Sequence, residues 1–269
     1  MTADGPSTPP STTAPSVVPV QATGRLSPVR AMVETGGRFM VSPQMDAAAE
    51  PFGMKSGAFY FRGRVAALGP VSAEVATSAL AIFPAPLIEL VWERSDSMPA
   101  PVALTGYTDA CVLWGREQFA SFGGALRLGE LVSRVVDACD ASSLVLFSAW
   151  QSQPRPDDVE GHAAFALMLL RELRGGLHFA ALRAHGLDIP VAVLADPNGG
   201  VSRLRLTGWR ADQIEALEKR AAAVHDLVNR WKAAEAMTAA AYEGAISVLT
   251  PTERSELDEL LLEAEAVSR

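Results

Sequence analysis

The chain has 269 residues, 49% of them hydrophobic, and carries a formal net charge of −8 with a pI of about 5.1. This length and apolar content are enough for a sizeable core, in one large domain or two small ones. An acidic chain repels a polyanion unless its basic residues gather on one face, so nucleic-acid binding is disfavoured by composition.

Several other classes of protein are excluded by what the sequence lacks. Cys111 and Cys139 are the only cysteines and form no CxxC spacing, so we expect reduced thiols in a cytoplasmic protein, without a disulfide framework or a zinc site. The longest apolar stretch, 79–92, is broken by two prolines and a glutamate and is too short to span a bilayer. The N-terminus lacks the pattern of a signal peptide. No nucleotide-binding loop occurs, and we expect no cofactor.

Three regions follow one another along the chain. Residues 1–26 are rich in Pro, Ser and Thr without apolar periodicity, which predicts a disordered tail. Residues 27–155 are predicted to form a helical N-terminal region, and 156–269 a helix-turn-helix-like region with a long helix and a C-terminal helix. The only strand-like pieces are 142–147 and 201–206. The predicted fold is therefore mainly α.

Helix signals punctuate these regions. A serine opens 72–83, and one apolar face runs through 128–139. Asp157 with Glu160 three residues later resembles a capping box and opens a helix that runs on through residue 170. Thr250-Pro251-Thr252-Glu253 is a stronger start, because it combines a cap residue, a proline at the first helical position and a glutamate at the third.

The clearest periodic signal follows Trp209. Apolar residues recur there at spacings of three and four, namely Ile214, Leu217, Ala221, Val224, Val228 and Trp231. Such a heptad seam predicts one long helix packed left-handedly against a partner. The partner is either a second copy, which makes the protein a homodimer, or the core of the same chain.

The stretch "RELRGGLHFAAL", 171–182, ends an apolar run with charge, two glycines and a histidine. On one helix, Arg171, Arg174 and His178 share a face, with Glu172 beside them. The glycines weaken a helix, so we expect a break or a close backbone approach there, which would place His178 at the start of a second helix. His162, sixteen residues earlier, falls on nearly the opposite side, and we expect no metal site.

Three stretches of the chain resemble an actinobacterial family described as SalK-like or as helix-turn-helix proteins. They are "GAFYFRGRVAALGPVSAEVATSALAIFPAPLIELVW" (57–92), "LFSAWQSQPRPDDVEGHAAFALMLLRELRGGLHFAAL" (146–182) and "LTGWRADQIEAL" (206–217). The likeness runs in the same order over residues 28–220. It implies a C-terminal half similar to MarR-type winged helices, which bind DNA as dimers and often respond to a ligand.

The sequence departs from the family pattern in places that bear on function. Arg210 stands where a capping serine is usual, and a helix continues where the family turns through a wing. The resemblance implies DNA contacts from Arg203, Arg205 and Arg210. The missing wing and the acidic flanks argue against them.

The expected ligand site combines both halves of the chain. Arg64 matches a recurrent arginine of the family and is expected, with Tyr60, to line a cavity shared with Arg171, Glu172, Arg174 and His178. We expect Glu172, Arg174 and His178 to form one connected buried cluster with Arg64, which is either a ligand pocket or an ion-paired hinge between helices.

Two functions from different classes remain open at this point. One is a ligand-responsive transcriptional regulator. The alternative is a small-molecule-binding protein or an enzyme of specialised metabolism that does not bind DNA. The sequence does not decide whether the chain catalyses a reaction.

Overall fold

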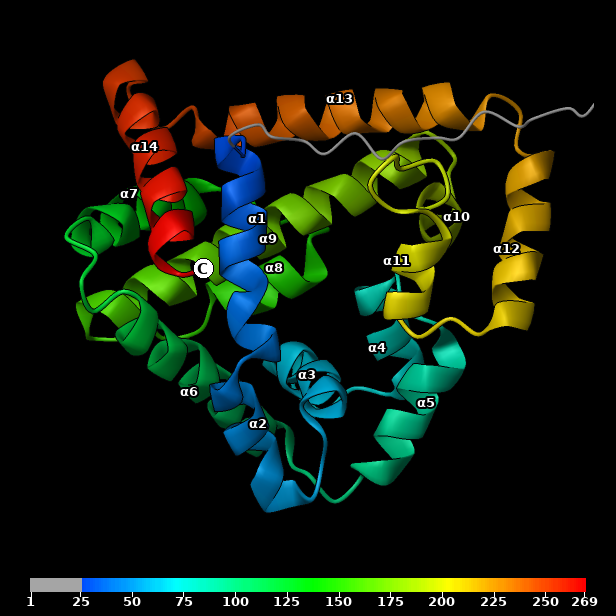
Figure 1. The fold of residues 1–269 in the computed structure, drawn as a ribbon, viewed down its shortest axis with the longest axis horizontal. Coiled ribbons are helices and arrows are strands. Elements are labelled where there is room, and N and C mark those ends of the chain that lie inside the picture. Colours follow the sequence, from blue (N-terminus) through cyan, green and yellow to red (C-terminus); the bar gives the residue numbers. More distant parts are fainter. Residues whose placement is uncertain (1–25) are drawn as a thin grey trace, which may run out of the picture.

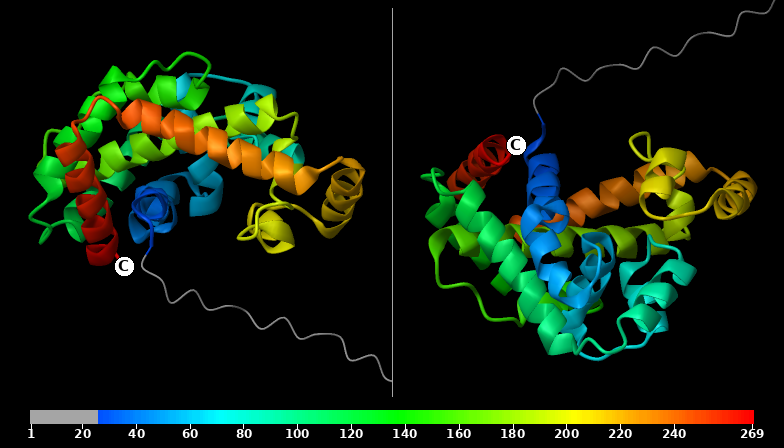
Figure 2. Two further views of the ribbon diagram at one scale, coloured as in Figure 1. Left: turned by 90° about the horizontal axis from the view of Figure 1, so that it is seen from above. Right: turned by 60° about the horizontal axis from the view of Figure 1, so that its bottom comes forward.

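A computed structural model describes residues 26–269, and this part of the chain consists of helices joined by turns (Figures 1 and 2). It holds fourteen α-helices and three short 3-10 turns, and no strand lies within these residues. The predicted mainly α fold is confirmed. The expectation of a disordered tail over 1–26 concerns residues that lie, apart from residue 26, outside the described part.

Helix α9 (Val159–Ala184) is the axis around which the other helices pack. It crosses the middle of the molecule and contacts α1 (Pro28–Arg38), α6 (Ala100–Gln118), α7 (Ala125–Ala138) and α13 (Leu227–Ile246) (Figure 1). It is buried on every side where it is most apolar, because residues 163–170 are all Ala, Phe, Leu or Met and all lie in the core.

Of the two expectations for Gly175 and Gly176, the break is wrong, because α9 continues through both glycines to Ala184. Each glycine costs a helix about 1 kcal/mol relative to alanine. The packing of α8 (Val145–Gln151) and α13 along the same helix offsets that cost. His178 therefore lies inside a helix and not at the start of one.

The remaining helices of the N-terminal half pack mainly on one another and on α6. They are α2 (Pro43–Ala49), α3 (Ser56–Val65), α4 (Ala73–Leu80) and α5 (Ala85–Arg94). The largest hydrophobic core runs from α1 to α14 (Pro251–Val267) and takes members from both sides of residue 155, so the predicted boundary at 155–156 does not divide it. A division of the chain into those regions stays a prediction.

Side-chain caps explain several helix starts. Ser72, Asp158 and Thr250 each accept a hydrogen bond from the backbone three residues on, as expected at an N-cap. The predicted capping box at Thr250 is confirmed. Near Asp157 the N-cap is Asp158 instead, and its third residue is Gly161, so no box forms there. The helix expected over 72–83 ends at Leu80, because Ala81 is in a left-handed conformation with φ 50°.

Both strand-like pieces lie in or beside helices. Residues 145–147 begin α8, and 201–206 lie in α11 (Gly200–Leu206). An apolar run of this length fits a buried helix face as well as a strand. Leu146, Phe147 and Leu204 are the buried members.

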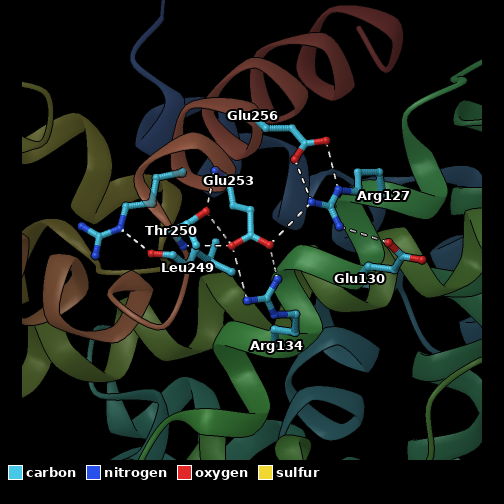
Figure 3. A network of polar contacts seen from close by, with 8 residues as sticks. Arg127, Glu130, Arg134, Leu249, Thr250, Glu253 and Glu256 are labelled. Atoms are coloured by element: carbon cyan, nitrogen blue, oxygen red, sulfur yellow. Dashed lines mark hydrogen bonds and ion pairs between the residues drawn. The ribbon is translucent and has the colours of Figure 1, made fainter.

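The C-terminal helix α14 is held to α7 by an exposed ionic network (Figure 3). Glu253 lies at its centre, ion-paired to Arg134 and 3.7 Å from Arg127. Arg127 also binds Glu256 through two hydrogen bonds of 3.0 and 2.9 Å. The side chain of Glu253 and the backbone of Thr250 form the capping box, so one carboxylate both starts α14 and docks it.

At the opposite end of the molecule from α14, α10 (Ile189–Ala192), α11 and α12 (Ala211–Ala223) lie together (Figure 1) and form a small unit. Its core consists of four buried side chains, namely Val191, Leu204, Ile214 and Leu217. We call this part the α10–α12 unit. After α12 the chain enters α13 directly, and no hairpin wing lies within the described residues.

The predicted long helix after Trp209 is wrong, because α12 and α13 are separate helices. The chain turns between them at Asp226, which is left-handed with φ 58°. Ile214 and Leu217 are buried inside the α10–α12 unit, whereas Trp231 packs in a second hydrophobic cluster beside the end of α9. Because of the turn, the apolar residues of α12 and α13 pack in these two different clusters. Val228 is 50% exposed. No helix in residues 26–269 is long and apolar enough to cross a membrane.

Candidate ligand cleft and DNA-contacting unit

A buried ion pair joins α3 to α9. The guanidinium of Arg64 donates from Nε and Nη2 to the two carboxylate oxygens of Glu172, at 2.8 Å each. Its Nη1 donates to the Tyr60 hydroxyl at 2.7 Å. Burial alone would lower the pKa of Arg64 and raise that of Glu172, but the partner's charge and hydrogen bonds outweigh it. The pKa of Glu172 lies below its ordinary value, so both groups are charged.

Two further groups adjoin this pair. Arg171 approaches Glu172 with its Nη1 3.5 Å from the nearer carboxylate oxygen, and its stem packs against Gly36 and Gly37 of α1. The Arg171 Nε and the Tyr107 hydroxyl are buried without a hydrogen-bond partner in residues 26–269. Burial raises the pKa of Tyr107 well above its ordinary value, so the phenol is neutral.

Arg174 and His178 belong to a different contact. Glu235 of α13 lies 3.7 Å from Arg174 Nη2 and 3.2 Å from His178 Nδ1. His178 Nδ1 also lies 3.3 Å from the Thr238 hydroxyl. Burial lowers the pKa of His178, with Glu235 opposing and Arg174 adding to the shift.

The predicted single cluster of Glu172, Arg174 and His178 is therefore wrong in part. Glu172 binds Arg64, as expected, but Arg174 and His178 face α13 and bind Glu235. The reason is the helical period, because residues two and six positions after Glu172 point to other sides of a continuous α9.

A cleft of about 690 Å³ opens beside the buried pair. Its walls are the end of α4 (77–81), the segment 143–147, one stripe of α9 and the start of α10 (188–190), and Arg64 reaches it from α3. We call it the α4–α9 cleft. The α9 stripe consists of residues spaced as one helix face, namely Glu172, Gly175, Gly176, Phe179, Ala180 and Arg183.

The double glycine forms part of this wall. A Cβ built on Gly175 meets no atom within 4 Å, and one on Gly176 approaches Leu144 at 3.1 Å. The glycines thus leave room on the side of α9 that faces the cleft. The sequence pattern drew attention to them but suggested a break, whereas the structure shows an unbroken helix with a hollowed face.

Backbone strain gathers at the same cleft. Three non-glycine residues of the described chain have positive φ, and two of them, Ala81 (50°) and Ser143 (65°), line the cleft. Such conformations cost about 1 to 3 kcal/mol each and occur preferentially at binding and active sites. The cleft is therefore the best-supported candidate for a ligand site. No group of three His, Cys, Asp or Glu able to hold a metal lies within residues 26–269.

The arginines expected to contact DNA lie on the surface of the α10–α12 unit. Arg203 and Arg205 are exposed on α11, and neither forms an ion pair within the described residues. Arg210 is the N-cap residue of α12, and its guanidinium pairs with Asp212. Gln213 accepts a hydrogen bond from the Arg210 backbone N–H, which is the half of a capping box that needs no acceptor side chain at the N-cap.

One hydrogen bond ties the cleft wall to this unit. The Trp209 indole, just before α12, donates to the carbonyl of Ile82 at 2.9 Å. Ile82 directly follows the strained Ala81 at the end of α4. Gly208 beside it has φ 90° and lies so close to Leu87 that a side chain there would collide.

Several residues of the cleft were not anticipated from the sequence. Arg183, Phe179 and Ser143 line it. Arg174 and His178, which were expected to line it, bind Glu235 instead. Phe179 and Arg183 follow Gly175 at intervals of four, so the helical stripe through the glycines was the available signal. Nothing local to Ser143 or Glu235 marks them.

Comparison with known proteins identifies the family. The chain matches a family described as a helix-turn-helix family over residues 22–267. It therefore belongs to that helix-turn-helix family. A search of curated proteins and a search of solved structures each found no match.

Proposed function

We propose that the protein is a ligand-responsive transcriptional regulator. In this proposal the α4–α9 cleft binds a small molecule, and the α10–α12 unit is the helix-turn-helix that contacts DNA. The observation that carries it is the position of the cleft, which is bounded by α4 and the 143–147 segment on one side and by the start of α10 on the other. Likeness to SalK-like and MarR-type proteins and a cytoplasmic location belong to the same proposal.

A route from ligand to DNA is present in the contacts. A ligand that displaces the end of α4 also displaces the Ile82 carbonyl, and Trp209 binds that carbonyl directly before α12. On the other wall, Asp188 precedes α10 and ion-pairs with Arg220 of α12. Both walls of the cleft are thus connected to α12. For the ligand to change DNA binding, it must bind more tightly when the α10–α12 unit is in one position than when it is in another.

The distribution of charge is compatible with DNA binding even though the chain is acidic. Residues 189–223 hold five basic and four acidic side chains, whereas 224–269 hold four basic and nine acidic ones. Most of that acidic surplus follows α13 into α14, at the far end from the α10–α12 unit (Figure 1). Arg203 and Arg205 remain unneutralised at the unit's surface.

The test is a mobility shift with DNA from upstream of the protein's own gene, at low and moderate salt. We expect binding that weakens steeply with salt. Replacing Arg203 and Arg205 with Gln should weaken it and lower the salt slope by about 0.9 for each phosphate that is no longer neutralised. Arg94→Gln, an exposed arginine on α5, is the control. Absence of binding at low salt would contradict the proposal and favour a ligand-binding protein that does not bind DNA.

A homodimer is the other part of the proposal that needs its own test. Most of the apolar seam of residues 214–231 packs against other parts of the same chain, but Val228 and Met237 of α13 are about half-exposed apolar side chains. Val228→Glu is therefore a cleaner change than one at Val224, which packs between two internal clusters. Light scattering should show a dimer that Val228→Glu dissociates. A monomeric wild type would refute the dimer.

A further inference from the structure

We propose that the ligand of the α4–α9 cleft is a small organic anion with an apolar body, held with a neutral acceptor group at the Arg64 end and its negative charge at Arg183. This inference rests on the proposed function only in taking the cleft as the ligand site. It does not depend on DNA binding.

The apolar body is indicated by part of the walls, beside the hydroxyl groups of Thr77, Ser78 and Ser143. Leu144, Leu146 and Phe147 line one side of the cleft, Phe179 projects from α9, and Ile189 and Pro190 close the end toward α10. The volume of about 690 Å³ lies within the range of pockets that take drug-sized molecules. Sites of that kind are mainly apolar, with a few polar groups that fix the orientation of the ligand.

The inner end of the cleft favours a neutral acceptor. Arg64 has five N–H donors, of which two bind Glu172 and one binds Tyr60, so two remain without an acceptor in the described chain. Glu172 already cancels the charge of the guanidinium. A carbonyl or hydroxyl oxygen can satisfy the remaining donors, whereas a second anion would add an unpaired charge beside a buried carboxylate.

The outer end of the cleft favours an anion. Arg183 lies three residues beyond Ala180 on the same stripe and forms no ion pair within residues 26–269. The acid on the opposite wall, Asp188, is neutralised by Arg220. Arg183 is therefore the one uncompensated charge among the residues that line the cleft, and its position separates the charge of the ligand from the Glu172 carboxylate.

A pair of fluorescent dyes tests this proposal without DNA. The first is 8-anilinonaphthalene-1-sulfonate, an apolar monoanion, and the second is N-phenyl-1-naphthylamine, which lacks the sulfonate. Gly175→Leu fills the cleft from a helix position where a Cβ meets nothing, so the protein should stay folded. We expect it to weaken binding of both dyes at least about tenfold. Gly244→Leu, at an equally open position of α13, is the matched control and should leave binding unchanged.

Arg183 is tested with the same two dyes. Arg183→Gln should weaken the sulfonate about two- to fivefold, as expected for an exposed ion pair, and leave the neutral dye unchanged. Arg94→Gln should alter neither. Melting curves confirm that each variant is folded.

Three results would overturn the proposal. One is that neither dye binds the wild-type protein. Another is that Gly175→Leu binds as the wild type does, while Leu113→Asn, in the apolar groove between α2 and α6, abolishes binding. The third is that Arg183→Gln affects both dyes equally, which would refute the statement that the ligand is an anion bound at Arg183. A failed mobility shift with intact dye binding would refute DNA recognition alone.

Discussion

Arginine–glutamate contacts serve two different purposes at the α4–α9 cleft and at the contact between α7 and α14. At the cleft, Arg64 and Glu172 form a bidentate pair whose side chains are 9% and 2% exposed. At the α7–α14 contact, Arg127 and Arg134 bind Glu253 and Glu256 with arginine side chains that are 38% and 45% exposed (Figure 3). Both are arginine–glutamate contacts between helices far apart in sequence.

The two contacts contribute differently to stability, because one is buried and the other is exposed. Exposed pairs are screened by water and salt and stabilise little, whereas a buried pair gains little overall but makes the loss of one partner costly. The network of Figure 3 thus orients α14 on α7 but contributes little to the free energy of unfolding. The Arg64–Glu172 pair determines which groups lie at the base of the cleft. Both residues stay charged, because the charge and hydrogen bonds of each outweigh the effect of burial on the pKa of the other.

The largest expected effect is that of Glu172→Ala. It leaves the buried Arg64 guanidinium without its carboxylate partner and should lower the free energy of unfolding by about 3 to 5 kcal/mol. Urea unfolding followed by circular dichroism measures it. The double variant Arg64→Met/Glu172→Leu removes both charges and should recover most of that loss. A double variant as unstable as the single one would mean that the pair itself, and not the stranded charge, provides the stability.

An intermediate effect is expected from Thr250→Ala at the start of α14. It removes the hydroxyl that accepts from the Glu253 backbone and should lower the free energy of unfolding by about 1 kcal/mol. Ser255→Ala, later in the same helix, is the control and should change stability by much less. Equal losses for both variants in urea unfolding would show that the cap is not what matters.

The smallest effect, and the one most sensitive to solution conditions, is expected from Glu253→Gln. Hydrogen bonds from Arg134 and from Thr250 lower the pKa of Glu253 from 4.5 to about 2. Because the pKa is lower in the folded state, the carboxylate stabilises the protein above pH 4.5, and this contribution is lost as the pH falls toward 2. The difference in Tm between wild type and Glu253→Gln should therefore shrink over that range.

High salt separates the two regions once more. At neutral pH, salt should reduce the effect of Glu253→Gln but leave that of Glu172→Ala largely unchanged. Thermal melts in low and high sodium chloride measure both. An equal salt dependence of the two variants would contradict the contrast between the buried pair and the exposed network.

The features predicted correctly from the sequence are mostly local. The Thr250 capping box and the Ser72 cap were predictable because a cap is decided by residues within one helical turn. The apolar face of 128–139 was predictable for the same reason. The Arg64–Glu172 contact spans 108 positions in the chain and was anticipated only because buried charges need partners, together with the resemblance.

The features predicted wrongly depend on neighbours that the local pattern does not reveal. The glycine pair suggested a break, but the helices packed along α9 hold it straight. The heptad seam suggested one helix, but Asp226 adopts a left-handed turn so that the seam can serve two separate clusters. Glu235 could not have been named as the partner of His178, because only the packing of α13 on α9 brings them together.

The open face at Gly175 has a consequence for how this protein responds to selection. A good helix former such as alanine would strengthen α9 there, because a Cβ at this position meets no atom within 4 Å and glycine is a poor helix former. Selection for thermal stability alone, as in a laboratory evolution experiment, should therefore replace this glycine early and fill the cleft. Under the proposed function, a population also selected for ligand binding at the cleft should keep the glycine, so the residue recovered at position 175 would report which property was under selection.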